Sequence, residues 1–102
     1  KKKKMSKFND LIKGETPVLA DFHATWCGPC KQLSPIIEEI AVDLKGKIKV
    51  IKIDIDKNQK AAEVYQIKGV PTMILFHKGK ILWKQSGVMP KQNIIGIIQQ
   101  HI

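Results

Sequence analysis

Short apolar runs alternate with amphipathic stretches along the whole 102-residue chain, and this alternation restricts the fold more than any other feature of the sequence. Apolar runs rich in β-branched residues predict strands at residues 18–23, 48–54, 72–77 and 81–86. Apolar residues at helical spacing predict helices at residues 6–13, 30–44, 59–65 and from about 90 to the end. Such an order of elements predicts an α/β fold in which helices cover a sheet, and a chain of this length has room for one domain.

The order of the predicted elements also indicates how the strands pair. Residues 18–23 and 48–54 flank the longest helix, which predicts a βαβ unit with parallel strands. The tripeptide Lys78-Gly79-Lys80 separates the last two strands and predicts a hairpin. Pro35 lies inside the longest helix, so we expect a kink there.

Every basic residue is a lysine, and the 18 lysines against 9 acidic residues give a net charge of +9. Residues 1–4 are all lysine; without them 14 lysines face 9 acidic residues, a net charge of +5. We interpret residues 1–5 as a lysine-rich tail, with a tag or trimmed leader and a native start as equal alternatives, and residues 6–102 as a single domain. Lysine lacks the planar fork of arginine, which argues against specific nucleic-acid recognition. The apolar runs are too short for a membrane span.

The two cysteines, Cys27 and Cys30, lie where the first predicted strand gives way to the longest helix. A bridge between them would close too short a loop to stabilise the fold. A zinc site would need a second ligand pair, whereas the three histidines are scattered, so we expect no metal. Structural cysteines or half a zinc site remain the alternatives to a redox-active pair.

The position of the pair predicts a division of labour between the two sulfur atoms. Unpaired N–H groups and the dipole at a helix N-terminus stabilise a thiolate, most of all at Cys27. Gly28 and Pro29 suit the first turn, because glycine is permissive and proline has no donor to lose. We predict that Cys27 attacks a substrate disulfide and that Cys30, which is more shielded, resolves the mixed disulfide.

The segment from Ala20 to Lys31, with the sequence ADFHATWCGPCK, resembles the active-site segment of the thioredoxin family. Further matches follow in chain order, at Pro35, Asp54-Ile55-Asp56, Lys68-Gly69-Val70-Pro71-Thr72 and Gly87. The resemblance implies a thioredoxin fold, with a central mixed sheet of four to five strands and helices on both faces. Because residues 1–5 make a poor strand, we expect four strands and at most a vestigial fifth at the edge.

The resemblance also implies a buried carboxyl group beneath the disulfide. Asp21 occupies that position as a general acid and base for Cys30, and its apolar neighbours agree with burial, which would raise its pKa. An exposed aspartate at a strand edge is the alternative. Lys52 matches a lysine near this aspartate, although it could also extend to solvent. His23 stands where many members carry an aromatic residue, and we expect it to be a half-buried structural histidine; the alternative is that its imidazole alters local packing, the thiol pKa or the choice of partner.

The remaining site residues form the substrate surface in this interpretation. They are Trp26, Gly28, Pro29, Val70, Pro71, Thr72 and Gly87. In the family a cis peptide bond before the proline exposes the backbone of the preceding residue, here Val70, to a substrate strand. No cofactor is expected, because the cysteine pair carries the electrons and a separate thioredoxin reductase supplies them.

The predicted function is the reduction of protein disulfides, since a Gly-Pro pair between the cysteines resembles the reducing members of the family. One alternative is an extracytoplasmic thiol-disulfide protein that acts as an oxidant or in cytochrome maturation. Another is a non-catalytic basic binding module. We expect a monomer in the cytoplasm whose partners are disulfide-containing proteins and a thioredoxin reductase; a trimmed leader would instead favour the periplasm or another extracytoplasmic site.

Overall fold

Four helices and four strands alternate through residues 2–102, which the computed structural model describes, with side chains from Lys7 onward. The helices are α1 (Lys2–Lys13), α2 (Gly28–Asp43), α3 (Gln59–Val64) and α4 (Lys91–His101). The strands are β1 (Val18–His23), β2 (Lys49–Asp54), β3 (Thr72–His77) and β4 (Lys80–Ser86). These bounds lie within two residues of the predicted ones, except at the start of α1.

Helix α1 begins at Lys2, four residues earlier than predicted, so part of the segment interpreted as a tail is helical. Lys1, the first residue of that predicted tail, lies outside the described residues. Lysine and methionine are good helix formers, and a helix extends readily once a nucleus is packed. Phe8 and Ile12 supply that nucleus, because both are buried against the sheet.

The strands of residues 2–102 form one mixed sheet in the order β2-β1-β3-β4. β1 is parallel to β2 and antiparallel to β3, and β3 is antiparallel to β4. The predicted βαβ unit and hairpin are therefore confirmed. Lys78 and Gly79 adopt φ angles of 54° and 82° in the hairpin turn, and such left-handed pairs match the twist of two-residue hairpins. Within the described residues there is no fifth strand.

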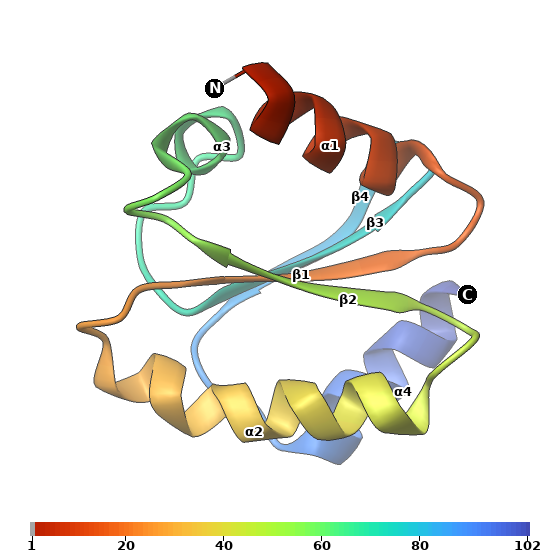
Figure 1. The fold of residues 1–102 in the computed structure, drawn as a ribbon. Helices are drawn as coiled ribbons and strands as arrows, with labels where there is room; N and C mark the ends of the chain where they lie inside the picture. The colour runs from red at the N-terminus through yellow and green to blue at the C-terminus, as the bar shows by residue number, and fades with distance from the viewer. Residues whose placement is uncertain (1) are drawn as a thin grey trace.

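Helices cover both faces of the sheet, as predicted: α1 and α3 lie on one face, α2 and α4 on the other (Figure 1). Side chains alternate along β1, so Val18, Ala20 and Phe22 join the core beneath α1 and α3. Leu19 points to the opposite core, beneath α2 and α4. By the same alternation Asp21 faces α2.

Helix α2 is the element that carries the cysteine pair, and both its own core contacts and α4 hold it in place. Leu33, Ile37 and Ile40 are fully buried beneath it, and Pro35 lies inside it as predicted. Lys91 of α4 contacts Asp43 at 2.9 Å and Glu39 at 3.3 Å, and these hydrogen bonds raise the pKa of Lys91.

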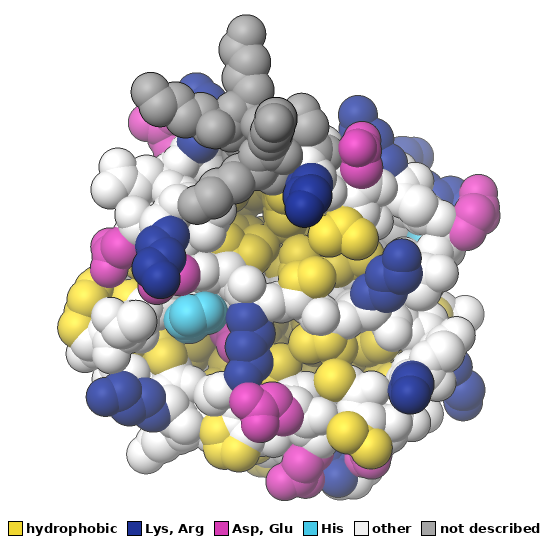
Figure 2. All heavy atoms as spheres, in the orientation of Figure 1, with side chains coloured by type: hydrophobic (Ala, Val, Ile, Leu, Met, Phe, Trp, Pro, Cys, Tyr) yellow, Lys and Arg dark blue, Asp and Glu magenta, His cyan; other side chains and the backbone are white. Residues whose placement is uncertain are grey.

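The surface mixes charges of both signs. Figure 2 shows lysine side chains interspersed with Asp and Glu, and hydrophobic side chains between them. Among residues 2–102, no helix is both long enough and apolar enough to span a bilayer.

Candidate active site

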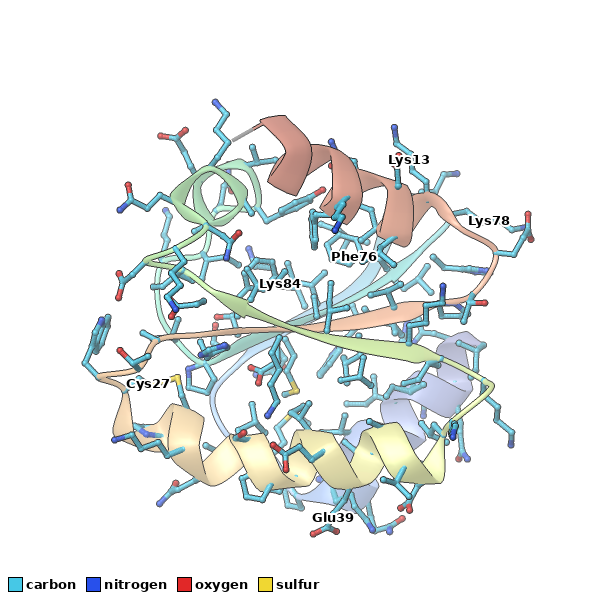
Figure 3. The ribbon with its side chains drawn as sticks, in the orientation of Figure 1. Lys13, Cys27, Glu39, Phe76, Lys78 and Lys84 are labelled. Atoms are coloured by element: carbon cyan, nitrogen blue, oxygen red, sulfur yellow. A yellow bond between two sulfur atoms is a disulfide. The ribbon has the colours of Figure 1, made fainter. Side chains whose placement is uncertain are left out.

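Cys27 and Cys30 form a disulfide at the N-terminus of α2, with their Cα atoms 5.3 Å apart (Figure 3). Cys27 is the N-cap residue and has an extended backbone. The backbone N–H of Cys30 donates to Sγ of Cys27 at 3.1 Å. Pro29 occupies the first turn, where it removes no helical hydrogen bond. An N–H group aimed at sulfur from a helix N-terminus stabilises a thiolate at that sulfur, which is Cys27.

Both cysteines are shielded from solvent in the disulfide form. Their exposed fractions are 5% for Cys27 and 4% for Cys30, so the two cysteines are almost equally shielded in the oxidised pair. The reason is that both pack in one small apolar cluster with Ala24, which Ile55 and Val70 also contact. What distinguishes the two sulfur atoms is therefore the hydrogen bond to Cys27.

Trp26 is the large exposed side chain next to the disulfide, with 68% of its surface accessible. Its indole Nε1 donates to Oδ2 of Asp56 at 2.9 Å. Asp54 in turn accepts the backbone N–H of Asp56 at 2.8 Å and shapes the loop after β2. The hydrogen bond between Asp56 and Trp26 was not predicted. Only the resemblance of residues 54–56 to the family indicated that this segment matters.

The loop before β3 lies against Cys27. The Val70–Pro71 peptide bond is cis, as the resemblance implies, and the carbonyl oxygen of Val70 lies 3.6 Å from Sγ of Cys27. The N–H of Gly87 donates to the carbonyl of Pro71 at 2.9 Å, and Gly87 has a φ of +96°. The side chain of Thr72 is 1% exposed and its hydroxyl bonds to Gly69 at 2.7 Å, so it supports the loop from within.

Asp21 is buried on the α2 face of the sheet, with an exposed fraction of 1%. Its Oδ1 atom has no hydrogen-bond partner among the described residues. Burial raises the pKa of the Asp21 carboxyl above its ordinary value of 3.8, and the charges of His23 and Lys52 offset part of that increase. The predicted burial is thus observed, and an exposed position at a strand edge is excluded.

A cavity of about 190 Å³ lies behind the disulfide and connects the predicted acid to the predicted resolving cysteine. It is lined by Asp21, His23, Ala24, Thr25, Cys30, Lys31, Ser34 and Lys52. The lining is partly polar and partly charged, so water can occupy the cavity and hydrogen-bond to Asp21. Asp21, Cys30 and His23 therefore share one compartment.

Lys52 stands opposite Asp21 in the parallel pair of strands, but its ammonium group bonds elsewhere. It donates to Oε2 of Glu38 at 2.8 Å and to the hydroxyl of Ser34, both on α2. Lys52 thus lies near Asp21, but the carboxylate on the helix, not Asp21, accepts its hydrogen bond, and its charge acts on Asp21 without one. The hydrogen bond and charge of Lys52 lower the pKa of Glu38.

Sequence reasoning missed Ser34 and Glu38. The signal was their spacing of four residues on one face of α2, but which strand residue would meet them depends on the packing of α2 on β2. Residues 2–102 contain no group of three or more His, Cys, Asp or Glu arranged to bind a metal ion.

A disulfide between residues three positions apart contributes little to the stability of a fold, yet its sulfur atoms can exchange with those of another disulfide. In this chain the pair follows the first strand of a βαβ unit, caps a helix and lies beside a cis-proline loop. That combination of fold and site defines a thiol-disulfide oxidoreductase.

Comparison of the sequence with known proteins identifies the family. The family model named Thioredoxin matches residues 1–100. The thioredoxin of Haemophilus influenzae is 36% identical over 92 residues, which cover 90% of this chain and 86% of that protein. The thioredoxin of Staphylococcus aureus is 42% identical over 84 residues, which cover 82% of this chain and 81% of that protein. The chain belongs to the thioredoxin family.

Proposed function

We propose that the chain acts in the reducing direction on protein disulfides, with Cys27 as the nucleophile and Cys30 as the resolving cysteine. The hydrogen bond from the Cys30 N–H to Sγ of Cys27 carries this assignment, because it stabilises a thiolate at one of the two sulfur atoms. The opposite order of attack would need an equivalent donor aimed at Cys30.

The reaction transfers two electrons from the cysteine pair to the substrate. The Cys27 thiolate attacks one substrate sulfur, and the other substrate sulfur leaves and is protonated to a thiol. The Cys30 thiol then gives its proton to ionised Asp21, and the resulting thiolate attacks Sγ of Cys27. The bond between Cys27 and the substrate breaks, the second substrate sulfur leaves as a thiolate that takes up a proton from water, and the 27–30 disulfide remains.

The substrate contacts the surface around Trp26 and the Val70–Pro71 loop. Gly28 and Pro29 present a turn without a bulky side chain, and the backbone of Val70 already lies beside Cys27. Pro71, Thr72 and Gly87 hold that loop in place through the hydrogen bonds described above, from Gly87 to Pro71 and from Thr72 to Gly69. An extended segment of the substrate protein can pair with the Val70 backbone while its disulfide reaches Cys27.

The disulfide formed in each cycle has to be reduced by a partner, and a thioredoxin reductase is the partner we propose. The chain acts as a monomer in the cytoplasm, without a cofactor of its own. The Gly-Pro pair between the cysteines, which resembles that of reducing family members, supports this direction of electron flow.

Insulin reduction in the presence of a dithiol tests the proposed activity. The unaltered chain should accelerate it, and Cys27→Ser should abolish the acceleration. Cys30→Ser should accumulate a mixed disulfide with the substrate through Cys27. An adduct that forms through Cys30 in Cys27→Ser but not through Cys27 in Cys30→Ser would reverse the assigned roles.

The reduction potential of the Cys27–Cys30 pair tests the direction. We expect a value near that of reducing thioredoxins, about −270 mV. A value well above the cytosolic glutathione poise would instead support an oxidant outside the cytoplasm.

A further inference from the structure

The cavity behind the disulfide brings His23 into the same compartment as the buried acid and the resolving cysteine. We propose that His23 exchanges protons between the Asp21 carboxyl and solvent, through water in this cavity, while Cys30 resolves the mixed disulfide. His23 would thus be a positioning and relay residue for Asp21. The inference rests on the proposed role of Asp21 and adds a route by which its proton leaves.

A route is needed because Asp21 has no direct access to solvent. Only 1% of its surface is exposed, and Oδ1 has no protein partner among the described residues. A proton that Asp21 takes from Cys30 has to move on before the next cycle. The cavity volume of about 190 Å³ is ample for water, since about 10–15 Å³ is sufficient for one molecule by this measure.

His23 lines the same cavity and is more accessible to solvent than Asp21. It is the last residue of β1, two positions after Asp21, so both side chains project from the same face of the sheet. The residue as a whole is half-buried.

The other charged groups that face His23 are poorer proton carriers. Lys52 on β2 and Lys31 on α2 also line the cavity, but the ammonium group of Lys52 donates to Ser34 and Glu38. Glu38 on α2 is held by Lys52, which lowers its pKa and keeps it ionised. Asp54 is the strand partner of His23 on β2 and is occupied by two backbone N–H groups of the following loop. Histidine is the side chain that gains and loses a proton between about pH 5 and 8.

The charge of His23 also acts on the Asp21 carboxyl group. After burial, which raises the pKa of Asp21, the charge of His23 has the largest opposing effect and exceeds that of Lys52. A protonated His23 therefore favours the ionised form of Asp21, which can accept the proton of Cys30. Once Asp21 is protonated, loss of the His23 proton to solvent lets the proton of Asp21 follow through the cavity water.

The resolving step can be followed alone with a chromophoric aryl disulfide as the substrate. Attack by Cys27 releases one aryl thiol, and attack by Cys30 releases the second in a separate phase. We expect His23→Gln to slow only the second phase, by about five- to tenfold at neutral pH, less than loss of the acid-base group itself. His101→Gln, a histidine substitution at the far end of α4, is the matched control and should leave both phases unchanged.

Two further variants separate proton transfer from a charge effect. His23→Ala opens space next to the cavity, so added imidazole should restore the rate of the second phase in a concentration-dependent manner. His23→Lys keeps a positive charge near Asp21 without a group that releases a proton at neutral pH, and it should remain slow. A normal rate in His23→Lys together with no rescue by imidazole would overturn the relay.

Asp21→Asn distinguishes failure of this inference from failure of the mechanism on which it rests. If Asp21→Asn slows the second phase and His23→Gln does not, the relay is wrong and the role of Asp21 stands. If Asp21→Asn leaves the second phase unchanged across about pH 6–9, the role of Asp21 fails and the relay fails with it. We expect both single variants to be slow and the double variant to be no slower than Asp21→Asn, since both residues serve one proton.

Discussion

The ammonium group of Lys52 lies 2.8 Å from Oε2 of Glu38, although the residue directly opposite Lys52 in the sheet is the buried Asp21. The positive charge of Lys52 therefore acts on two carboxyl groups, those of Glu38 and Asp21. The one on α2 accepts its hydrogen bond, and the buried one receives only the weaker effect of its charge. Helix α2 therefore influences the acid beneath the disulfide through the lysine that Glu38 binds.

Replacement of Glu38 should alter the titration of Asp21. Glu38→Gln removes a negative charge and weakens the hold on Lys52, so the positive potential at Asp21 increases and its pKa falls toward the ordinary value of 3.8. The pH profile of the resolving step should move to lower pH by the same amount. Carboxyl titration by NMR and the pH dependence of the second aryl-thiol phase measure the two effects.

Glu39→Gln is the matched control, because Glu39 is adjacent on α2 and pairs with Lys91 of α4 instead. It should leave the Asp21 titration unchanged. An equal shift in both variants would mean that the loss of any negative charge on α2 is sufficient and that the position of Lys52 is irrelevant.

Removal of the Asp21 charge should stabilise the fold above acidic pH. The raised pKa means that between 3.8 and the folded-state value the native chain holds a proton that the unfolded chain has released. Stability is therefore highest below the ordinary pKa and declines as the pH rises through this range. Asp21→Asn has no such titration, so its advantage should grow from about pH 4 upward to on the order of 2 kcal/mol. Urea unfolding at several pH values measures it; an advantage that is the same at pH 3 and pH 8 would contradict the titration as its cause.

Local patterns were sufficient to predict most of the fold. The strands have apolar runs, the amphipathic helices follow a 3.6-residue period, and the hairpin turn has glycine at a left-handed position, so each signal lies within a few neighbouring residues. The start of α1 was missed because a lysine run resembles a solvated tail. The packing of Phe8 and Ile12 on the sheet stabilises the helix, and the helix then extends towards the N-terminus.

The residues of the site also fall into those that local sequence patterns predict and those that depend on long-range contacts. Cys27 and Cys30 were visible because their chemistry depends on spacing and on the helix start. The contact of Cys27 with Val70 spans 43 positions and was available only through the family resemblance. The hydrogen bond from Lys52 to Glu38 spans 14 positions and depends on how α2 packs against β2, so neither periodicity nor the resemblance indicated it.

Lys84 should stabilise the segment that leads to the cis-proline loop. Its ammonium group, on β4, donates to the carbonyl oxygens of Tyr65 at 2.9 Å and Gln66 at 3.3 Å, at the C-terminal end of α3 (Figure 3). These carbonyls follow the last turn of the helix and gain from a cation. Lys84→Met should reduce the free energy of unfolding by about 1 kcal/mol. Lys80→Met, at the start of the same strand, is the control; an equal loss in both would point to a general effect of charge on β4.

Gly87 and Gly96 offer a paired test of backbone conformation near the site. Gly87 has a φ of +96° and its N–H anchors the carbonyl of Pro71, whereas Gly96 lies inside α4; an added Cβ atom would meet no atom within 4 Å at either position. Gly87→Ala should therefore destabilise the fold by about 1–2 kcal/mol through backbone strain alone. Gly96→Ala should stabilise it by about 0.5–1 kcal/mol, because alanine favours a helix. Urea unfolding of both variants gives the two differences, and a stabilising or neutral Gly87→Ala would show that the loop relaxes to another backbone conformation without losing its bond to Pro71.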